Sequence, residues 1–246
     1  MLRSSEKGEK SKTSPEYLPK KYQELIEYHS QKPYFSEPYR TLRTNLHLLN
    51  SHNPLKTLLV TSSEPAEGKT TILVNLAISF SEEGKSVLII DSDLRKPKIH
   101  KFFEIESYPG LTEILLGSKK LEAVIKNINT HFNVIASGSL PKDPLKLFGT
   151  PMMKDLVNSL KPKFDVILFD SPPVLSADDA VLISKFVDGV IFVLNSGFVK
   201  EAIVKKAKAR IEKFKANVLG IVMNRFDAKR HGYSYNPYDR YYYISR

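Results

Sequence analysis

The chain contains no cysteine among its 246 residues, and this absence excludes several kinds of site. Without thiols there is no disulfide framework, no thiolate metal site and no cysteine-held iron–sulfur cluster, as is usual in a reducing compartment. No apolar run approaches the roughly 20 residues that a membrane-spanning helix needs. The basic start, MLRSSEKGEKSK, is not followed by an apolar segment, so no secretory signal is expected. We therefore expect a cytoplasmic protein that reaches a membrane through peripheral contact or a partner.

Acidic residues are outnumbered by basic ones. The 37 Lys and Arg face 27 Asp and Glu, which gives a formal net charge of +10. Such an excess favours polyanionic partners, meaning nucleotides, nucleic acid or acidic lipid. The length and the 41% hydrophobic content suit one α/β domain of ordinary size with room for terminal extensions.

The two ends of the chain differ in composition from its middle. We predict a mostly flexible N-terminal segment over residues 1–35, because its first part is rich in Ser, Lys and Glu and poor in large apolar residues. One folded domain is expected over residues 36–228. Residues 229–246 contain six of the twelve tyrosines, with Gly232 and Pro237 opposing regular structure, so we expect a tyrosine-rich flexible tail.

Short apolar runs alternate with helical patterns through the middle of the chain. Several runs are continuous, which is typical of strands that are buried on both faces of a parallel sheet. This βαβ order predicts an α/β fold, a mainly parallel sheet with helices on both faces, whose ligands bind at the carboxyl ends of the strands. The predicted strands are 57–61, 87–90, 132–136, 166–169, 190–194 and 218–223, and the predicted helices include 70–83, 111–116, 151–160, 200–214 and one that starts near 39.

The stretch SSEPAEGKTT lies between the first predicted strand and an apolar helix. A phosphate-binding loop needs inward backbone N–H groups, a lysine that reaches the β- and γ-phosphates, and a hydroxyl that ligates Mg²⁺. The helix that starts here would direct its positive end at the anion. The alternative is a surface helix start with a solvated lysine. We predict that the ATP-binding residues of this stretch are Glu67, Gly68, Lys69, Thr70 and Thr71.

Two other predicted strands end in aspartates. Asp91 and Asp93 follow the second strand and would point to the same side of an extended chain, where their charges repel unless a cation lies near them. Asp170 follows the run 166–169 in the Walker-B arrangement, in which the carboxylate holds Mg²⁺. Strand-end capping is the alternative for the first pair. We predict that Lys69, Asp91, Asp93 and Asp170 are catalytic and that Mg²⁺ is held by Thr70, Asp93 and Asp170.

These elements together resemble the MinD/ParA-like branch of P-loop proteins, which implies a P-loop NTPase fold. Within that branch, LIIDSDLRKPKIHKFF, GLTEILLG and FDSPPVLSADDAVL are similar to the bacterial tyrosine kinases (BY-kinases) of capsule and exopolysaccharide systems. The resemblance covers roughly residues 36–226 and the tyrosine tail. It implies an ATP-dependent protein-tyrosine kinase that autophosphorylates its tail and regulates polysaccharide synthesis, with ATP and Mg²⁺ as cofactors.

Some positions depart from these patterns. Ser63 stands where the first glycine of the phosphate loop belongs, and Glu64 stands where the partition and division ATPases carry a signature lysine. The kinases typically read Pro-Gly-Glu-Gly-Lys-Ser, whereas Ala66 replaces the first of these glycines here and Thr70 replaces the serine. A Cβ at position 66 costs about 1 kcal/mol if that residue needs a positive φ, so the departure bears on nucleotide affinity.

The resemblance also implies sites outside the phosphate loop. Glu37, Arg40 and Arg43 match the Glu-x-x-Arg-x-x-Arg motif that joins subunits of these kinases into a ring; the alternative is a solvated helix face with local ion pairs. Asn224 and Arg225 resemble the strand-end pair with which relatives approach the adenine, although Asn224 could simply cap a strand. The predicted phosphorylation sites are Tyr233, Tyr235, Tyr238, Tyr241, Tyr242 and Tyr243.

The implied partners follow from the family. They are a membrane-bound activator that recruits the kinase to the inner face of the cell membrane, further copies of the chain in a ring, a cognate tyrosine phosphatase, and protein substrates of polysaccharide synthesis. The alternative function is that of a MinD/ParA-like ATPase acting as a DNA- or membrane-associated positioning factor, which the net charge and the basic stretch 200–215 favour. Glu64 and the tyrosine tail argue against it, and nucleic acid is not an expected partner.

Overall fold

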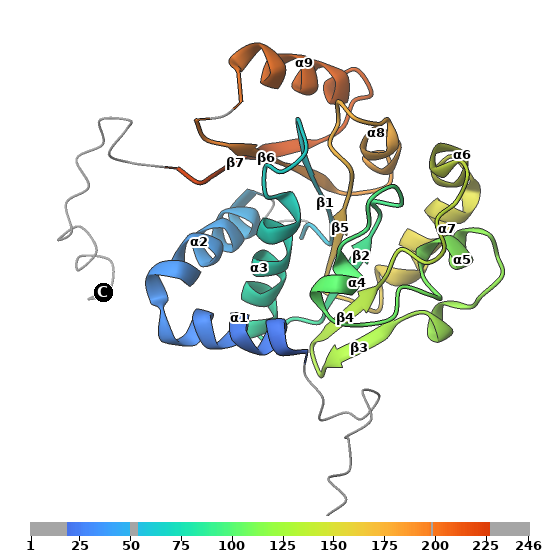
Figure 1. Cartoon of the computed structure of the whole chain (residues 1–246), viewed down its shortest axis with the longest axis horizontal. Helices are drawn as coiled ribbons and strands as arrows, with labels where there is room; N and C mark the ends of the chain where they lie inside the picture. Colours follow the sequence, from blue (N-terminus) through green and yellow to red (C-terminus); the bar gives the residue numbers. More distant parts are fainter. Residues whose placement is uncertain (1–18, 50–53, 198, 227–246) are drawn as a thin grey trace, which may run out of the picture.

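The computed structural model describes residues 19–49, 54–197 and 199–226. Over these residues the chain forms three layers, with helices on both faces of a seven-stranded sheet (Figure 1). The strand order is β3-β4-β2-β5-β1-β6-β7, and every pairing is parallel except that of β3 with β4. The predicted α/β fold with a mainly parallel sheet and helices on both faces is confirmed.

Each predicted strand corresponds to a strand of the sheet. The edge strand β3 was missed because its sequence, KNIN, has no apolar run; it pairs antiparallel with β4 across a short turn. The strands are β1 (Thr57–Ser62), β2 (Val87–Asp91), β3 (Lys126–Asn129), β4 (Phe132–Ile135), β5 (Val166–Asp170), β6 (Gly189–Asn195) and β7 (Val218–Asn224).

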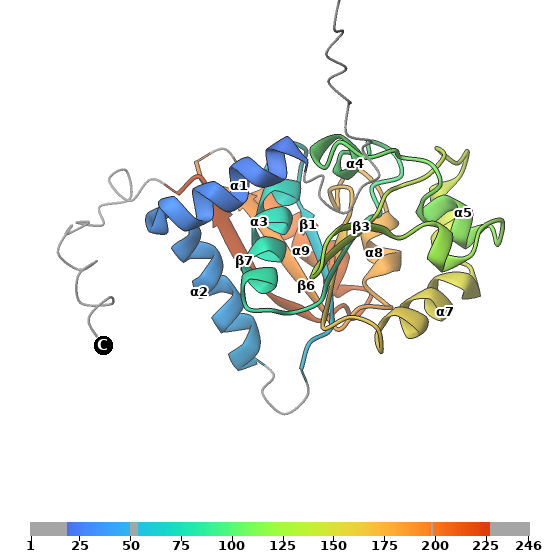
Figure 2. The same ribbon diagram turned by 90° about the horizontal axis from the view of Figure 1, so that it is seen from below.

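The helices divide between the two faces of the sheet. On one face lie α1 (Lys20–Gln31), α2 (Pro33–Leu49), α3 (Lys69–Glu82) and α4 (Ile99–Phe102), and Figures 1 and 2 show α1 and α2 in blue beside α3. The other face carries α5 (Leu111–Leu115), α6 (Pro144–Phe148), α7 (Pro151–Leu160), α8 (Asp179–Ile183) and α9 (Glu201–Glu212), with the 3₁₀ turn η1 (Leu121–Ala123) nearby.

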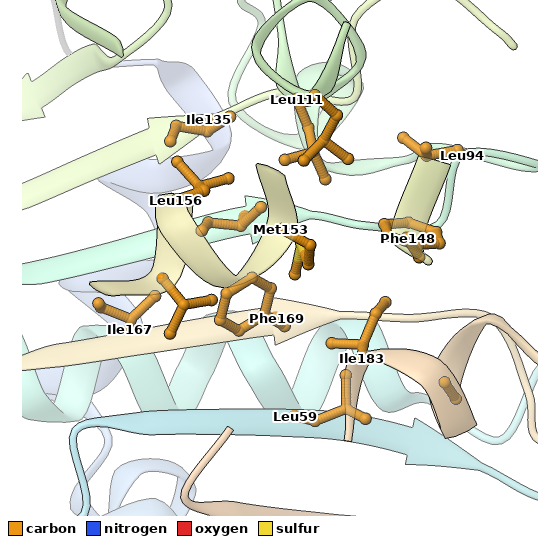
Figure 3. Packing of buried hydrophobic residues seen from close by; sticks show 14 of the residues in the cluster. Leu59, Leu94, Leu111, Ile135, Phe148, Met153, Leu156, Ile167, Phe169 and Ile183 are labelled. Carbon is orange, nitrogen blue, oxygen red and sulfur yellow. The ribbon is translucent and has the colours of Figure 1, made fainter. Parts of the chain in front are cut away.

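Alternate residues of the central strands form the two halves of the core. Leu58 and Val60 of β1 pack toward α3, whereas Leu59 packs toward α7 and α8. In Figure 3, Met153 of α7 lies over Phe169 of β5, in the half of the core that also contains Leu59. Because both faces are covered, β1, β2 and β5 are buried along their whole length, which explains their unbroken apolar runs.

Helix α1 lies inside the segment, residues 1–35, that the sequence predicts to be mostly flexible, and the structure differs from the prediction there. Tyr22 is 1% exposed, packs against Phe103 and Phe132, and accepts a hydrogen bond from Asn129 at 2.7 Å. The helix is therefore held by tertiary contacts that its own polar sequence does not reveal. Residues 1–18 and the predicted tail 229–246 lie outside the described part of the chain.

Candidate active site

The predicted phosphate loop connects β1 to α3 and ends at a left-handed glycine. Gly68 has φ 94°, and a Cβ built there would lie 2.0 Å from Nδ2 of Asn224, so both the backbone conformation and the space require glycine. Ala66 has φ 67°, the conformation in which its Cβ costs about 1 kcal/mol. The loop therefore has the shape of a phosphate-binding loop even though alanine replaces a family glycine.

Glu67 holds this loop in place from inside. Its Oε2 accepts hydrogen bonds from the Ser63 hydroxyl at 2.8 Å and from the Glu64 N–H at 2.7 Å. Its backbone carbonyl accepts from Nδ2 of Asn224 at 2.9 Å. The serine that replaces the first glycine of the motif thus contributes a hydroxyl that stabilises the turn, and the Glu67 side chain is directed into the loop.

Four of the predicted catalytic and metal residues meet at the carboxyl edge of the sheet. Nζ of Lys69 lies 3.0 Å from Oδ1 of Asp170 and 3.4 Å from Oδ2 of Asp93. The Thr70 hydroxyl donates to Oδ2 of Asp170 at 2.8 Å. The side chains of Lys69, Asp93 and Asp170 are 11%, 7% and 1% exposed. The positive charge therefore lies between two buried negative charges.

Strand order explains why these distant residues meet. β5 lies between β1 and β2, and Asp91 is in register with Asp170 on the neighbouring strand. Lys69 begins the helix that follows β1. The carboxyl ends of three adjacent parallel strands thus converge on one point, the usual ligand site of such sheets.

Asp91 and Asp93 have different surroundings, because the strand ends at Asp91 and the chain then turns. Oδ2 of Asp91 accepts from the backbone N–H groups of Lys98 at 3.0 Å and Ile99 at 2.9 Å. Its Oδ1 is buried and has no hydrogen-bond partner among the described residues. Asp93 accepts from the Lys96 N–H at 3.0 Å and faces Lys69. The expected alternation of an extended strand therefore does not apply to this pair.

Burial and mutual repulsion shift the ionisation of these groups. Burial, followed by the charge of Asp170, raises the pKa of the Asp91 carboxyl to about 7. Burial also raises the pKa of Asp170, against the opposing effects of Lys69 and Thr70. Burial opposes the charge of Lys69, but the charges of Asp170 and Asp93 outweigh it and raise the pKa of this ammonium. Lys69 is thus protonated at neutral pH, and Asp91 is close to its midpoint.

We predict a pH dependence of stability that traces to Asp91. Its pKa of about 7 in the folded protein exceeds the ordinary value of 3.8, so between pH 4 and 7 the unfolded chain loses a proton that the folded chain keeps. The free energy of unfolding then falls as pH rises through this window, by up to roughly 4 kcal/mol, and is level above it. Urea denaturation at pH 5 and pH 8 with EDTA and no nucleotide measures this. Asp91→Asn is expected to flatten the dependence, and an unchanged slope in that variant would contradict the assignment.

The residues present fit a magnesium ion bound together with a nucleotide. Two buried carboxylates, those of Asp93 and Asp170, share the ammonium of Lys69, and Oδ1 of Asp91 has no donor within the described chain. Among the described residues no group of three or more His, Cys, Asp or Glu side chains is arranged to hold a metal. Mg²⁺ commonly takes one or two carboxylates, waters and substrate phosphates, for which Thr70, Asp93 and Asp170 suffice.

Asn224 and Arg225 lie at the end of β7, beside the phosphate loop. The Asn224 amide donates to the Glu67 carbonyl, and its Oδ1 accepts from the Arg225 N–H at 2.9 Å. Arg225 has φ 55° and is exposed. Asn224 therefore shapes the loop directly, and a contact of this pair with the adenine stays a prediction.

Arg95 makes a contact that sequence spacing could not reveal. Its Nε donates to Oδ2 of Asp179 at 2.6 Å and its Nη2 donates to Oδ1 at 3.2 Å, which is a bidentate pair. Asp179 is fully buried at the start of α8. This pair connects the turn after β2 to the start of α8, although 84 positions separate the two residues along the chain.

The three residues of the predicted ring motif lie on α2, and two of them contact α3 of the same chain. Nη2 of Arg40 lies 3.4 Å from Oε2 of Glu82. Arg43 donates to both oxygens of Ser79, and its side chain is only 16% exposed. Glu37 is exposed. Arg43 is therefore part of the helix packing, and Glu37 and Arg40 remain accessible to a neighbouring subunit.

Two further predictions concern parts of the chain beyond the site. The six predicted phosphorylation sites, Tyr233 to Tyr243, lie outside the described residues. No helix within residues 19–49, 54–197 and 199–226 is both long and apolar enough to cross a membrane.

Known proteins with this sequence pattern and fold are nucleotide-binding P-loop proteins and tyrosine kinases. The ParA family, described as NUBPL iron-transfer P-loop NTPase, matches residues 54–239. Tyrosine-protein kinase YwqD of Bacillus subtilis is 37% identical over 197 residues, which are 80% of this chain and 83% of YwqD. The putative tyrosine-protein kinase CapB of Staphylococcus aureus is 30% identical over 220 residues, 89% of this chain and 94% of CapB. The crystal structure of the chimerical protein CapA2B2 superimposes with a TM-score of 0.77 at 33% identity, covering 85% of this chain and 92% of that one.

Proposed function

The chain belongs to the bacterial tyrosine-protein kinases of the ParA-like P-loop class, and from this membership we propose that it phosphorylates its own C-terminal tyrosines and regulates capsular or exopolysaccharide synthesis. The observation that supports the proposal is the position of Lys69 between Asp93 and Asp170, with Thr70 bonded to Asp170. A lysine, a hydroxyl and acids from two strands are what phosphoryl transfer from a nucleotide requires.

In the proposed reaction, Lys69 binds the β- and γ-phosphate oxygens and neutralises charge that develops on them. Asp91 accepts the proton of the acceptor tyrosine as its oxygen attacks the γ-phosphorus, and the bond from that phosphorus to the bridging oxygen breaks to release ADP. A base with a pKa of about 7 suits proton transfer from a tyrosine, whose own pKa is near 10. Thr70, Asp93 and Asp170 hold Mg²⁺, which supplies charge neutralisation on the phosphates.

Intact-mass spectrometry after incubation with Mg²⁺-ATP tests the proposal. We expect mass additions of one or more phosphates that map to residues 233–243 and disappear after phosphatase treatment. An unchanged mass, or phosphate found only on serine and threonine, would refute it. The alternative of a positioning ATPase is not favoured, because the relatives at 30% identity or more, such as YwqD and CapB, are named tyrosine-protein kinases.

We also propose that copies of the chain form a ring through Glu37 and Arg40. The double variant Glu37→Ala/Arg40→Ala removes the exposed Glu37 and the partly exposed Arg40 but leaves the contact between Arg43 and Ser79 intact. We expect its dissociation constant for self-association to rise at least about tenfold, since it loses interfacial charge pairs. Sedimentation velocity over a range of concentrations measures this, with Lys119→Ala/Lys120→Ala as a matched surface control. Equal mass distributions for the variant and the wild type would remove the ring interface from this face.

The remaining partners are proposed on the same basis. A membrane-bound activator would recruit the kinase to the inner face of the cell membrane, a tyrosine phosphatase would reset the tail, and proteins of polysaccharide synthesis would be substrates. The link to polysaccharide synthesis is supported by a 33% identical relative of Klebsiella pneumoniae named "putative tyrosine-protein kinase in cps region", of which this chain covers 26%. Cell fractionation with and without the candidate activator tests recruitment, and a kinase that stays in the soluble fraction in both cases would contradict it.

A further inference from the structure

A hollow is lined in part by the turn that follows β2, the same turn whose backbone N–H groups bind Asp91 and Asp93. It has a volume of about 490 Å³. Volumes of 300–1,000 Å³ are typical of small-molecule sites. Its lining comes from the segment between β2 and α4, from α4 itself, from the segment between α4 and α5, and from the loop after β4. The lining residues are Lys96, Pro97, Lys98, His100, Lys101, Ser107, Gly138 and Leu140.

Ser107 and Gly138, which line the pocket together with the lysines, belong to segments that are held by hydrogen bonds. The buried Glu113 accepts hydrogen bonds from the Gly110 N–H at 2.8 Å and the Ser139 N–H at 3.2 Å. A Cβ on Gly138 would lie 2.1 Å from Oε2 of the same glutamate, and Gly138 has φ 82°. The Gly138 N–H donates to the Ser107 carbonyl at 3.1 Å. This explains the glutamate of the GLTEILLG motif, which positions one side of the pocket.

The pocket has unbalanced positive charge. Within the described part of the chain, none of the three lining lysine ammonium groups has a carboxylate within 4.0 Å, whereas Lys69, Lys161 and others do. An anion with several oxygens would pair with these three ammonium groups. The nearby Pro97 and the 66% exposed Leu140 offer apolar surface to whatever carries the anion.

The pocket is linked covalently and by hydrogen bonds to the catalytic acids. The N–H of Lys96 donates to Asp93, and that of Lys98 donates to Asp91, so the backbone that lines the pocket also orients both carboxylates. Because the pocket and the catalytic acids share this backbone, a short extended segment, at roughly 3.3–3.6 Å per residue, would connect an anion bound here to a residue at the point of phosphoryl transfer. The tail has tyrosines at closely spaced positions, three of them consecutive at 241–243.

We propose that this pocket binds a phosphotyrosine of the acceptor segment and thereby presents a neighbouring tyrosine to the catalytic site. The lysines would contact the phosphate, and Pro97 and Leu140 would contact the aromatic ring, a combination of contacts that free phosphate cannot make. The inference rests on the proposed kinase function. It predicts that the tail tyrosines are phosphorylated in sequence, because a tail that already carries one phosphate becomes the better substrate.

Binding to tail peptides, measured without ATP, tests the proposal. The full chain, treated with phosphatase, is titrated with fluorescent peptides of residues 229–246, either unmodified or phosphorylated singly at each of the six tyrosines. At least one phosphopeptide is expected to bind about tenfold or more tightly than the unmodified peptide, as charge-assisted contacts allow. Lys98→Gln/Lys101→Gln should abolish most of this difference, while Lys119→Gln/Lys120→Gln, with the same loss of charge at exposed positions, should keep it.

The other outcomes overturn the proposal. If none of the six phosphopeptides binds more tightly than the unmodified one, the pocket does not read phosphotyrosine. If inorganic phosphate binds as tightly as the best phosphopeptide, the pocket is a phosphate-ion site only. If Lys98→Gln/Lys101→Gln weakens sedimentation with anionic lipid vesicles but leaves peptide binding unchanged, the face contacts membrane. Because no ATP is present, these results are separate from failure of kinase activity, which intact-mass measurement reports.

Discussion

Lys69→Met is expected to lower tail phosphorylation at least about 100- to 1,000-fold, the usual loss when one preorganised electrostatic contact to the transition state is removed. Lys69 forms ion pairs with both Asp93 and Asp170, so its loss removes the positive charge between them. Intact-mass kinetics with Mg²⁺-ATP measures the loss, and Lys154→Met on the exposed side of α7 provides a control of the same chemical change.

The same variant has a structural consequence. Without the ammonium, Asp170 loses the positive charge that opposes the effect of burial on its pKa, so it should hold a proton to a higher pH. Because the unfolded chain gives up that proton near pH 4, the variant should become less stable than the wild type as pH rises from 4 to 8. Circular dichroism at pH 6 is expected to show an intact fold. Undiminished labelling in a folded variant would refute the role of Lys69.

Asp170→Asn is expected to lower phosphorylation about 100-fold or more at ordinary Mg²⁺ and to raise the Mg²⁺ concentration that gives half-maximal rate. The amide keeps the shape of the side chain and can still accept from the Thr70 hydroxyl, so the change isolates the charge. Removing this charge also removes a cause of the raised pKa of Asp91, which should shift the pH–rate midpoint downward. Rates across Mg²⁺ and pH titrations measure both effects.

Asp91→Asn provides the comparison that separates base from metal ligand. If Asp91 acts as the base, Asp91→Asn lowers the rate and leaves the Mg²⁺ concentration for half-maximal rate unchanged. If Asp91 is a metal ligand, the same variant raises that Mg²⁺ concentration, as is expected for Asp170→Asn. Asp155→Asn, an exposed change on α7, is the matched control. A wild-type Mg²⁺ requirement in Asp170→Asn would remove that residue from the metal site, and an unaltered rate in Asp91→Asn would remove Asp91 from the mechanism.

Local signals were sufficient for the strands and the phosphate loop but not for the elements held by distant contacts. β1, β2 and β5 are recognisable because burial on both faces requires unbroken apolar runs. Helix α1 and strand β3 have no such signal. α1 depends on Tyr22 fitting between Phe103 and Phe132, and β3 depends on pairing with β4. Each is stabilised by residues about 80 or more positions away, or by a partner strand.

The amino-acid sequence by itself determined the fold class, the loop that binds phosphate and the identity of the acids that end two strands, because apolar periodicity, glycine and charge are local properties of the chain. Only the tertiary structure decided which partners each acid has: Asp93 faces Lys69, whereas Asp91 accepts hydrogen bonds from the backbone of Lys98 and Ile99. It also decided that Arg95 binds Asp179. It also decided that Arg43 packs within the chain and that three lysines surround one hollow. The reason is physical: such contacts depend on strand order and on where the chain turns after each strand, and no spacing along the sequence encodes either.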